Sequence, residues 1–279
     1  MDKIKILVAC HKPWKVYQND VYAPIHVGRA VSECKDEMAD MIGDDTGDNI
    51  SEKNPQYCEL TALYWAWKNL HDVEYIGFCH YRRYFDINIG GLNCESLLYD
   101  KDVLALRYTY YHSMYWEMLR YVSLEDFTIL LMVLKKKYPD YEKTMIDYLY
   151  GNVLYPKNMF ICRREIFVQY AEWLFDVLFE CEKYIKPSPY SRGKRSLAYM
   201  GEYLMPVYMN YHKMKISFIQ EKKEYVSTIR ISLGLYRRYL LSKYLFKLKS
   251  LIEKKPKTLE YYYDPAAITG LEKDGIKIG

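Results

Sequence analysis

The chain has 279 residues, half of them hydrophobic, and a formal net charge of +4. This length suits one large domain, or one domain with a helical appendage, and the apolar content excludes global disorder. A net charge this small does not by itself support a nucleic-acid-binding protein.

The first part of the chain predicts an α/β sheet. IKILVAC, residues 4–10, is an apolar and β-branched run that is typical of a central parallel strand. A polar loop is expected over 11–28, and residues 24–35 predict a short helix. The segment 42–55 is dense in Gly, Asp and Asn, which predicts another loop.

A helix and two strands are expected next. Asn54 is predicted to cap the helix, with Pro55 at its first position, and QYCELTALYWAWKNL then has apolar side chains at helical spacing. VEYIGFC, residues 73–79, predicts a second apolar strand. DVLALR, residues 102–107, predicts a weaker one.

The second half of the chain is predicted to be mainly helical. Residues 113–150 should form helices that break at Ser123 and Pro139. Two more helices are expected, over 164–184 and over 195–212.

Extended chain and a helical tail complete the pattern. Residues 152–162 predict extended chain, and KISFI at 215–219 predicts a last strand. A basic helical tail is expected from about residue 221, with a frayed end after Pro256. The alternation at the front of the chain favours a mixed, mostly parallel α/β sheet with inserted and appended helices.

Basic side chains follow two of the predicted strands. His11 and Lys12 come after the first strand, and His80, Arg82 and Arg83 come after the second. Ligands of open α/β sheets bind beyond the carboxyl ends of the strands, so these groups converge if the two strands are parallel neighbours. Arg presents a planar fork that matches phosphate oxygens, and Lys presents a point charge. The pattern therefore predicts a diphosphate ligand.

Acidic side chains leave alternatives open at the same place. Arg82 and Arg83 could pair with Asp86, or with the acids of the 44–48 loop, instead of binding a ligand. That loop offers hard oxygen ligands for a metal ion, but it lacks the spacing of a calcium-binding loop. A structured loop that contributes carboxylates to a polar ligand is favoured.

Other motifs narrow the function further. Glu202 and Glu59 stand in apolar surroundings, so each is either paired in the core or faces a site, as a general base would. GxSxG, P-loop and GxGxxG motifs are absent, which weakens three common enzyme classes. Seven cysteines without a CxxC pair, no signal peptide and no apolar run of 18 residues predict a cytosolic protein with reduced thiols.

Several segments of the chain resemble a known family. In order, they are KILVACHKPW, YAPIHVGRA, DDTGDNISEKNPQYCELTALYWAWKNL, YIGFCHYRRYF and NMFICRREIFVQYAEWLFDVLFECEK. Over roughly residues 3–220 they are similar to the bacterial capsular and exopolysaccharide glycosyltransferases long catalogued as a domain of unknown function. The resemblance implies a GT-A-like fold, sugar transfer from a nucleotide-activated donor and cytoplasmic work on a lipid-linked glycan. Some members are linked to galactofuranose transfer.

The resemblance also assigns roles at the strand ends. Many GT-A enzymes have a DXD motif there, which holds a divalent cation against the donor diphosphate, whereas this chain has HYRRYF. His80, Arg82, Arg83 and Lys12 are therefore predicted to bind the diphosphate. Mn²⁺ or Mg²⁺ could bind but is not expected to be required, and no metal ligand is assigned. The segment 104–123 departs from the relatives, so it says little about the acceptor.

Further residues receive roles from the same resemblance. RSLAYMGEYL matches the late R-x-x-x-Y/F-x-x-E stretch of the relatives, which implies that Glu202 is the general base of an inverting transfer. Contacts to the nucleotide or the sugar are expected from His11, Asp45, Asp48, Asn49 and Asn158.

The expected organisation is a GT-A-like domain over 1–220 and a basic, helical extension over 221–279. Nine basic residues and one acid lie between Arg230 and Lys257. This segment either lies on an anionic membrane, at the inner face of the plasma membrane, or packs on the domain.

The expected function is transfer of a hexose, such as galactofuranose, from a UDP-sugar to a lipid-linked glycan in capsule or exopolysaccharide synthesis. Two alternatives belong to other classes of protein. One is a non-catalytic nucleotide- or sugar-binding scaffold of a polysaccharide assembly complex. The other is a membrane-surface interaction protein that binds no nucleotide.

Overall fold

The structure is a computed structural model, and it describes residues 4–86, 94–107, 109–110, 113–155, 158–191, 193–222 and 228–278. The chain divides into two compact units. The sheet unit comprises Met1–Arg107, Pro156–Phe175 and Lys213–Glu224. The helical unit comprises Tyr108–Tyr155, Asp176–His212 and Tyr225–Gly279. Most of the expected C-terminal extension is thus grouped with helices from the middle of the chain.

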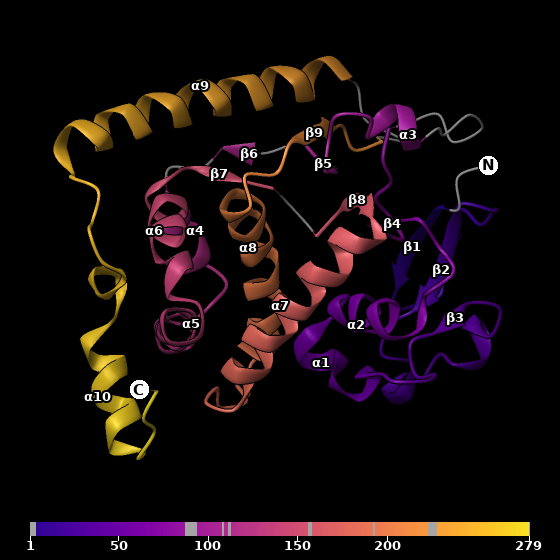
Figure 1. Ribbon diagram of the computed structural model, residues 1–279, viewed down its shortest axis with the longest axis horizontal. Coiled ribbons are helices and arrows are strands. Elements are labelled where there is room, and N and C mark those ends of the chain that lie inside the picture. Colours follow the sequence, from indigo (N-terminus) through magenta and orange to yellow (C-terminus); the bar gives the residue numbers. More distant parts are fainter. Residues whose placement is uncertain are drawn as a thin grey trace. The chain divides into compact units, whose positions relative to one another are not determined.

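A seven-stranded sheet forms the core of the sheet unit (Figure 1), in the order β3-β2-β1-β4-β8-β5-β9. Its strands are β1 (Ile4–Cys10), β2 (Tyr22–His26), β3 (Ile42–Gly43), β4 (Tyr75–His80), β5 (Val103–Leu106), β8 (Phe160–Arg163) and β9 (Ile216–Ile219). β8 runs antiparallel to both of its neighbours, β4 and β5, and the other pairs are parallel. The predicted mixed, mostly parallel sheet is confirmed.

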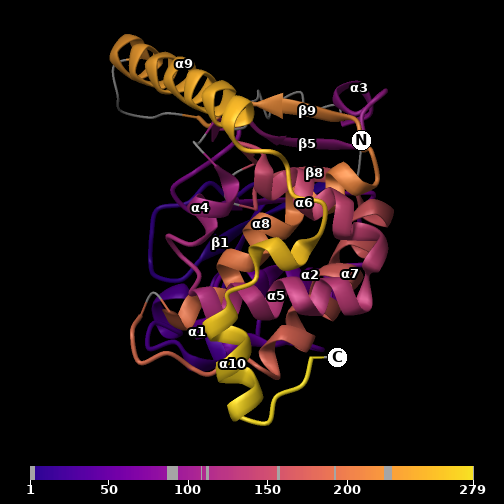
Figure 2. The ribbon, with the colours of Figure 1, turned by 90° about the vertical axis from the view of Figure 1, so that its left-hand side faces the viewer.

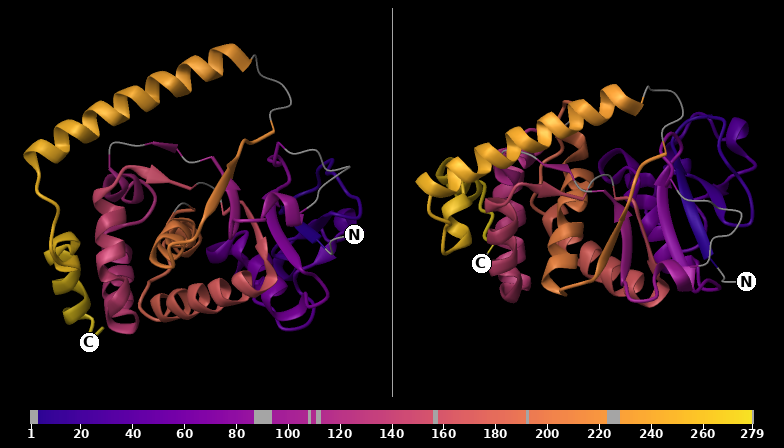
Figure 3. Two further views of the ribbon diagram at one scale, coloured as in Figure 1. Left: turned by 45° about the horizontal axis from the view of Figure 1, so that its top comes forward. Right: turned by 90° about the horizontal axis from the view of Figure 1, so that it is seen from above.

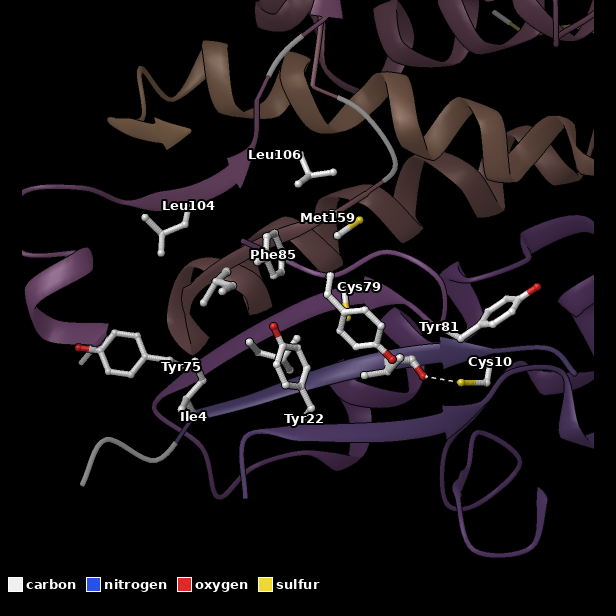
Figure 4. Close-up of a cluster of buried hydrophobic side chains, with 14 of the residues drawn as sticks. Ile4, Cys10, Tyr22, Tyr75, Cys79, Tyr81, Phe85, Leu104, Leu106 and Met159 are labelled. Atoms are coloured by element: carbon white, nitrogen blue, oxygen red, sulfur yellow. Dashed lines mark hydrogen bonds between the residues drawn. The ribbon is translucent and has the colours of Figure 1, made fainter. Parts of the chain in front are cut away.

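The central strands are buried on both faces, which explains their nearly continuous apolar sequences. Ile4, Ile6, Val8 and Cys10 project from one face of β1 into a cluster with Tyr22 and other buried side chains (Figure 4). On β4, Phe78 contacts Phe160 of β8 and Phe167 of α7 (Arg164–Glu182), at ring-centroid distances of 5.3 and 5.1 Å.

The predicted loop is present over residues 11–21 but not over 22–26, and the predicted helix over 24–35 is wrong. Tyr22–His26 is strand β2, which pairs in parallel with β1 over its whole length. The chain leaves the strand at Gly28, whose φ of 68° is left-handed, and only a 3-10 turn follows, Arg29–Val31. Pairing with the buried β1 overrides the weak local preference of this segment.

The predicted helix after the acidic loop is interrupted. Asn54 lies inside the short helix α1 (Asn54–Tyr57) rather than at its cap, and α2 (Leu60–Asn69) begins after a break at Cys58. Cys58 has a φ of 48°, which is uncommon for a residue with a side chain. The Asn54 side-chain amide donates to the Cys58 carbonyl at 2.8 Å and so stabilises the break.

The helical unit matches most of the helices predicted for it. Its helices are α4 (Met114–Met118), α5 (Leu124–Lys137), α6 (Glu142–Tyr150), α8 (Ser196–Tyr211), α9 (Thr228–Ile252) and α10 (Pro265–Lys273). The Ser123 hydroxyl accepts the Asp126 N–H at 3.1 Å, so the predicted helix start is confirmed. α6 contacts α4 and α8, and α10 contacts α5 (Figure 2).

Three further elements are short, and one long helix is shared. α3 (Cys94–Leu97) belongs to the sheet unit. β6 (Thr109–Tyr110) and β7 (Val153–Leu154) form an antiparallel pair in the helical unit. α7 is shared, with residues to Phe175 in the sheet unit and those from Asp176 in the helical unit.

The predicted frayed end after Pro256 is wrong. Leu259, Tyr262, Ala267 and Leu271 are buried, and the Leu259 N–H donates to the Glu142 carboxylate at 3.0 Å. These apolar contacts fix η7 (Leu259–Tyr262) and α10 within the helical unit. Lysines precede this segment, but its buried apolar side chains decide its position.

α9 is one uninterrupted helix (Figure 3) with sides of different character. One side contacts the helical unit, where Ser242 is buried, Phe246 contacts Tyr150, and Lys249 donates to Ser113 and to the Tyr150 carbonyl. Another side carries exposed apolar and aromatic side chains at helical spacing: Leu241, Tyr244, Leu245, Leu248, Leu251 and Ile252. We call these six residues the α9 apolar stripe.

Candidate active site

The turn after β4 places a basic pair beyond the end of the sheet. The Arg83 N–H donates to the His80 carbonyl at 2.8 Å, which closes the turn, and the Tyr81 N–H donates to the Ala9 carbonyl at 3.2 Å. β1 and β4 are parallel neighbours, so this turn lies beside the residues that follow β1. The parallel, neighbouring strands on which the predicted convergence depended are therefore present.

Aromatic side chains gather the cations of the two strand ends. The Arg82 guanidinium lies 4.8 Å from the Tyr81 ring centroid and 5.7 Å from that of Trp14. The Lys12 Nζ lies 5.7 Å from the same Trp14 ring, and the His11 ring packs edge-on against Tyr81. Cation–π contacts thus hold the charges of Lys12 and Arg82 close despite their mutual repulsion, and His11 lies against the same Tyr81 ring.

The two aromatic residues are a part of the site that the sequence prediction did not include. Trp14 is about half exposed, whereas Tyr81 is buried. The available signal was an aromatic residue next to the basic residues at both strand ends.

Arg83 has different surroundings from Arg82. Its Nε lies 3.6 Å from a carboxylate oxygen of Glu221, just after β9, and both side chains are partly exposed. The adjacent backbone carries an isolated bridge between Phe85 and Glu221. The acid is neither Asp86 nor one of the 44–48 loop. A half-exposed ion pair contributes about 1 kcal/mol or less, so Glu221 holds Arg83 only weakly.

The first acid of the DDTGDNIS motif is a structural residue. Asp44 is fully buried, and its carboxylate accepts from the Gly28 N–H (2.7 Å), the Arg29 N–H (3.0 Å), the Ser51 hydroxyl (2.5 Å) and the Thr61 hydroxyl (2.6 Å). Four donors fill the acceptor capacity of a carboxylate. Asp44 therefore ties the loops after β2 and β3 to α2 and has no capacity for a ligand.

The other polar residues of this loop lie in different places and have different partners. Asp45 follows β3 at the sheet edge and lies 3.9 Å from the Arg29 guanidinium. Asp48 accepts from the Tyr64 hydroxyl at 3.0 Å, and its N–H donates to Asn69 at the last residue of α2. Asn49 bonds within the loop, to Gly47 and Ser51. The structure thus leaves Asp45 near the strand ends and places Asp48 beside the C-terminal half of α2.

Asn158 lies at the strand ends and contacts an acid. It precedes β8, and it is two residues beyond the Phe78–Phe160 pair, as His80 is on β4. Its side-chain amide donates to Glu59 at 3.2 Å.

Glu202, the predicted general base, lies on α8 in the helical unit. Its side chain is half-buried between buried neighbours, and the next residue, Tyr203, donates its hydroxyl to the Glu117 carbonyl at 3.2 Å. The cations at the strand ends all belong to the sheet unit.

A divalent cation of the kind found in many GT-A enzymes does not fit the end of β4. Such a cation prefers carboxylate oxygens, whereas the turn presents His80, Arg82 and Arg83. Within the described ranges, no group of three His, Cys, Asp or Glu side chains could hold a metal ion.

Comparisons with known proteins agree with this fold. The family described as a domain of unknown function, DUF4422, matches residues 5–213. The chain belongs to this family. The resemblance that the sequence motifs indicated is confirmed.

A solved structure extends the comparison. The apo structure of WbbM, a bifunctional glycosyltransferase, is similar to this chain with a TM-score of 0.72 and 30% sequence identity. The match covers 79% of this chain and 45% of that one, so the chain spans less than half of the protein it resembles. No curated protein matches the chain. The likeness shows that this DUF4422 chain has a glycosyltransferase fold.

Proposed function

We propose that this DUF4422 chain is a glycosyltransferase that takes its sugar from a UDP-linked donor. The observation that carries the proposal is the group of cations at the ends of β1 and β4, Lys12 and Arg82, held against Trp14 and Tyr81. Sugar transfer leaves a nucleoside diphosphate, whose developing charge these cations would stabilise. His80 and Arg83 belong to the same turn and complete the proposed diphosphate site.

The remaining groups have proposed roles around that site. His11 and Asp45, which lie at or near strand ends, are the better-placed candidates for nucleotide contacts. Asp48 and Asn49 would need the loop to reach the donor from the side of α2. Because the turn offers guanidiniums where carboxylates would hold a cation, we propose that transfer does not require Mn²⁺ or Mg²⁺.

Glu202 is the proposed general base. It would accept the proton of the acceptor hydroxyl as the bond to the donor sugar forms, which is the task of a carboxylate in an inverting transfer.

The proposed acceptor is a lipid-linked glycan of capsule or exopolysaccharide synthesis, and the proposed sugar is a hexose such as galactofuranose. The α9 apolar stripe and its neighbouring lysines support a position on the inner face of the plasma membrane, where such an acceptor would be found. Among the described residues, no helix is both long and apolar enough to span a bilayer.

A thermal-shift screen tests the proposal. The purified chain is mixed with UDP, other nucleoside diphosphates and UDP-hexoses, each with EDTA or with Mn²⁺. We expect UDP and at least one UDP-hexose to raise the melting temperature equally in both conditions. No shift with any nucleotide would contradict the proposal.

Hydrolysis of the bound donor separates an enzyme from a non-catalytic scaffold. An enzyme should release UDP slowly from a UDP-hexose without acceptor, and Arg82→Ala should abolish that release. Binding without release, with or without added acceptor, would favour the scaffold.

A further inference from the structure

A carboxylate and a buried amide meet where the strands of the sheet unit end. Glu59 is the residue before α2, and Asn158 lies two residues before Phe160, the first residue of β8. In the antiparallel pairing of β4 with β8, Asn158 and His80 each lie two residues beyond the Phe78–Phe160 pair. The Met159 carbonyl also accepts the Leu106 N–H at 3.3 Å, so the end of β5 is adjacent as well.

The contact between them is held by a strained backbone. Asn158 and Cys58, the residue before Glu59, both have a φ of 48°, in the left-handed region. Asn adopts this conformation more readily than most residues, whereas at Cys58 it costs energy and persists because the surrounding structure fixes it. Here they set the Asn158 amide 3.2 Å from one carboxylate oxygen of Glu59.

The hydrogen bonding of the pair is incomplete. Asn158 is 2% exposed, and its side-chain oxygen has no hydrogen-bond partner among the described residues. Glu59 is half-buried, and in the described part of the chain no Lys, Arg or His pairs with it. A carboxylate has about four acceptor positions, and one amide donor leaves most of them open. The Asn158 oxygen, a buried acceptor without a donor among the residues described, indicates a missing partner, and the open acceptor positions of Glu59 lie on a partly exposed side chain.

We infer that Glu59 is a binding residue for the donor sugar, with its carboxylate accepting hydrogen bonds from hydroxyls of the hexose ring, and that Asn158 is the residue that positions it. This inference rests on the proposed function. The hexose of a UDP-sugar is attached to the second phosphate, so it must lie next to whatever binds the diphosphate. Asn158 lies beside the end of β4, from which His80 and Arg82 extend.

The chemistry of the two partners is complementary. A hexose ring offers hydroxyl donors and carries no charge. It can therefore donate hydrogen bonds to a carboxylate without the charge repulsion that a phosphate group would cause. Hydrogen bonds from hydroxyls to a carboxylate are charge-assisted and strong. A site built in this way also discriminates against a sugar that lacks the hydroxyl, because the carboxylate is then left without its partner.

Isothermal titration with UDP and with UDP-galactopyranose, UDP-galactofuranose, UDP-glucose and UDP-N-acetylglucosamine tests the inference. Glu59→Gln keeps the side-chain shape and the acceptor for Asn158 but removes the charge. We expect it to weaken binding of the preferred UDP-hexose by about 10- to 100-fold and to leave UDP affinity unchanged. Glu52→Gln, at an exposed acid in the 3-10 turn Ser51–Lys53, is the matched control and should change neither affinity.

A second variant tests the positioning role. Asn158→Gly tolerates the left-handed backbone but removes the amide, so it should weaken UDP-hexose binding and spare UDP binding. Among monodeoxy analogues of the preferred donor, at least one should show a smaller difference in affinity between wild-type and Glu59→Gln protein, because a hydroxyl that donates to Glu59 is gone.

The outcomes separate the sugar-binding role of Glu59 from the proposed function. Equal loss of UDP and UDP-hexose binding in Glu59→Gln would overturn the subsite and indicate a structural role. Unchanged UDP-hexose binding would also overturn it, while the proposed function would stand. If the wild-type chain binds neither UDP nor any UDP-hexose, the proposed function fails, and this inference fails with it.

Discussion

Arg82 and Arg83 are neighbours in sequence with different surroundings, and this difference has measurable consequences. Arg82 lies against Tyr81 and Trp14 beside Lys12, whereas Arg83 is paired with Glu221. We expect Arg82→Ala to lower kcat/KM for sugar transfer by at least about 100-fold, as loss of a group that stabilises developing charge does.

Arg83→Ala serves as the comparison, because Arg83 must leave an ion pair before it reaches a phosphate. Its effect should be smaller, below about 10-fold, and Glu221→Gln should not lower the rate. Steady-state kinetics of Arg82→Ala, Arg83→Ala and Glu221→Gln measure these effects. An Arg83 effect as large as that of Arg82 would mean that the ion pair with Glu221 does not reduce the contribution of Arg83 to the diphosphate site.

His26, at the end of β2, predicts a pH dependence of stability. Its side chain is fully buried, and neither ring nitrogen has a hydrogen-bond partner among the described residues. Burial lowers the pKa of His26 below its ordinary value of 6.5, more than the nearby Asp44 raises it. As the pH falls below 6.5, the unfolded chain binds a proton that the folded chain does not, so folded stability is lost.

Denaturant unfolding at pH 7.5 and pH 5.5 measures this loss. One such histidine contributes a slope of at most about 1.4 kcal/mol per pH unit. His26→Phe, which removes the titrating group, should flatten the slope. Burial also lowers the pKa of His212, so this residue should remain a smaller source of the pH dependence. An identical slope in His26→Phe would show that other groups cause the dependence.

Among the helices, α9 makes a specific prediction about membranes. The apolar stripe is exposed while the opposite side contacts the helical unit, and α9 contains no acidic residue. Lys243 and Lys247 are exposed on a third side of α9, and the exposed Lys254 follows the end of the helix. Lysines beside an apolar stripe are complementary to an anionic bilayer, where each contributes about 1 kcal/mol of binding free energy.

Co-sedimentation with vesicles measures the binding. We expect the chain to bind vesicles that contain phosphatidylglycerol and to bind pure phosphatidylcholine weakly. Leu248→Glu with Ile252→Glu should abolish binding, and Lys243→Gln with Lys247→Gln should reduce it by about 10-fold or more. A wild-type chain that stays in solution but forms a dimer, lost in the Leu248→Glu variant, would show that the stripe contacts a second copy.

Local sequence patterns predicted the elements whose packing agrees with them. The strands at 4–10 and 75–80, and the helices from Ser123 and Arg164, were predictable because burial reinforces their apolar periodicity. β2 was not, since its pairing with β1 is a long-range interaction that overrides local preference. The break at Cys58 depends on a side-chain bond from Asn54 and likewise has no signal in periodicity.

In the site, residue types were predictable and partners were not. Basic residues after two apolar strands indicated where charge gathers. That Arg83 pairs with Glu221 depends on β9, which joins the sheet from far along the chain. That Asp48 turns toward Asn69 depends on the path of the loop along α2.

For the molecule as a whole, the proposed donor-binding residues and the proposed base fall in different compact units. Binding and transfer should therefore be separable by substitution. Glu202→Gln should bind the UDP-hexose with unchanged affinity yet lower kcat for transfer by at least about 100-fold. Titration calorimetry and an acceptor-dependent transfer assay measure the two quantities. Full transfer activity in Glu202→Gln would assign the base to another residue.

Asp44 has a consequence for how members of this family diverge. One side chain satisfies two backbone amides and two hydroxyls that come from three separate segments of the sequence. A substitution of Asp44 alone should be strongly destabilising, because each of its four donors would then be buried without a hydrogen-bond acceptor. We expect positions 44, 51 and 61 to change together among homologues, so the persistence of this aspartate would record a shared folding requirement rather than a shared substrate.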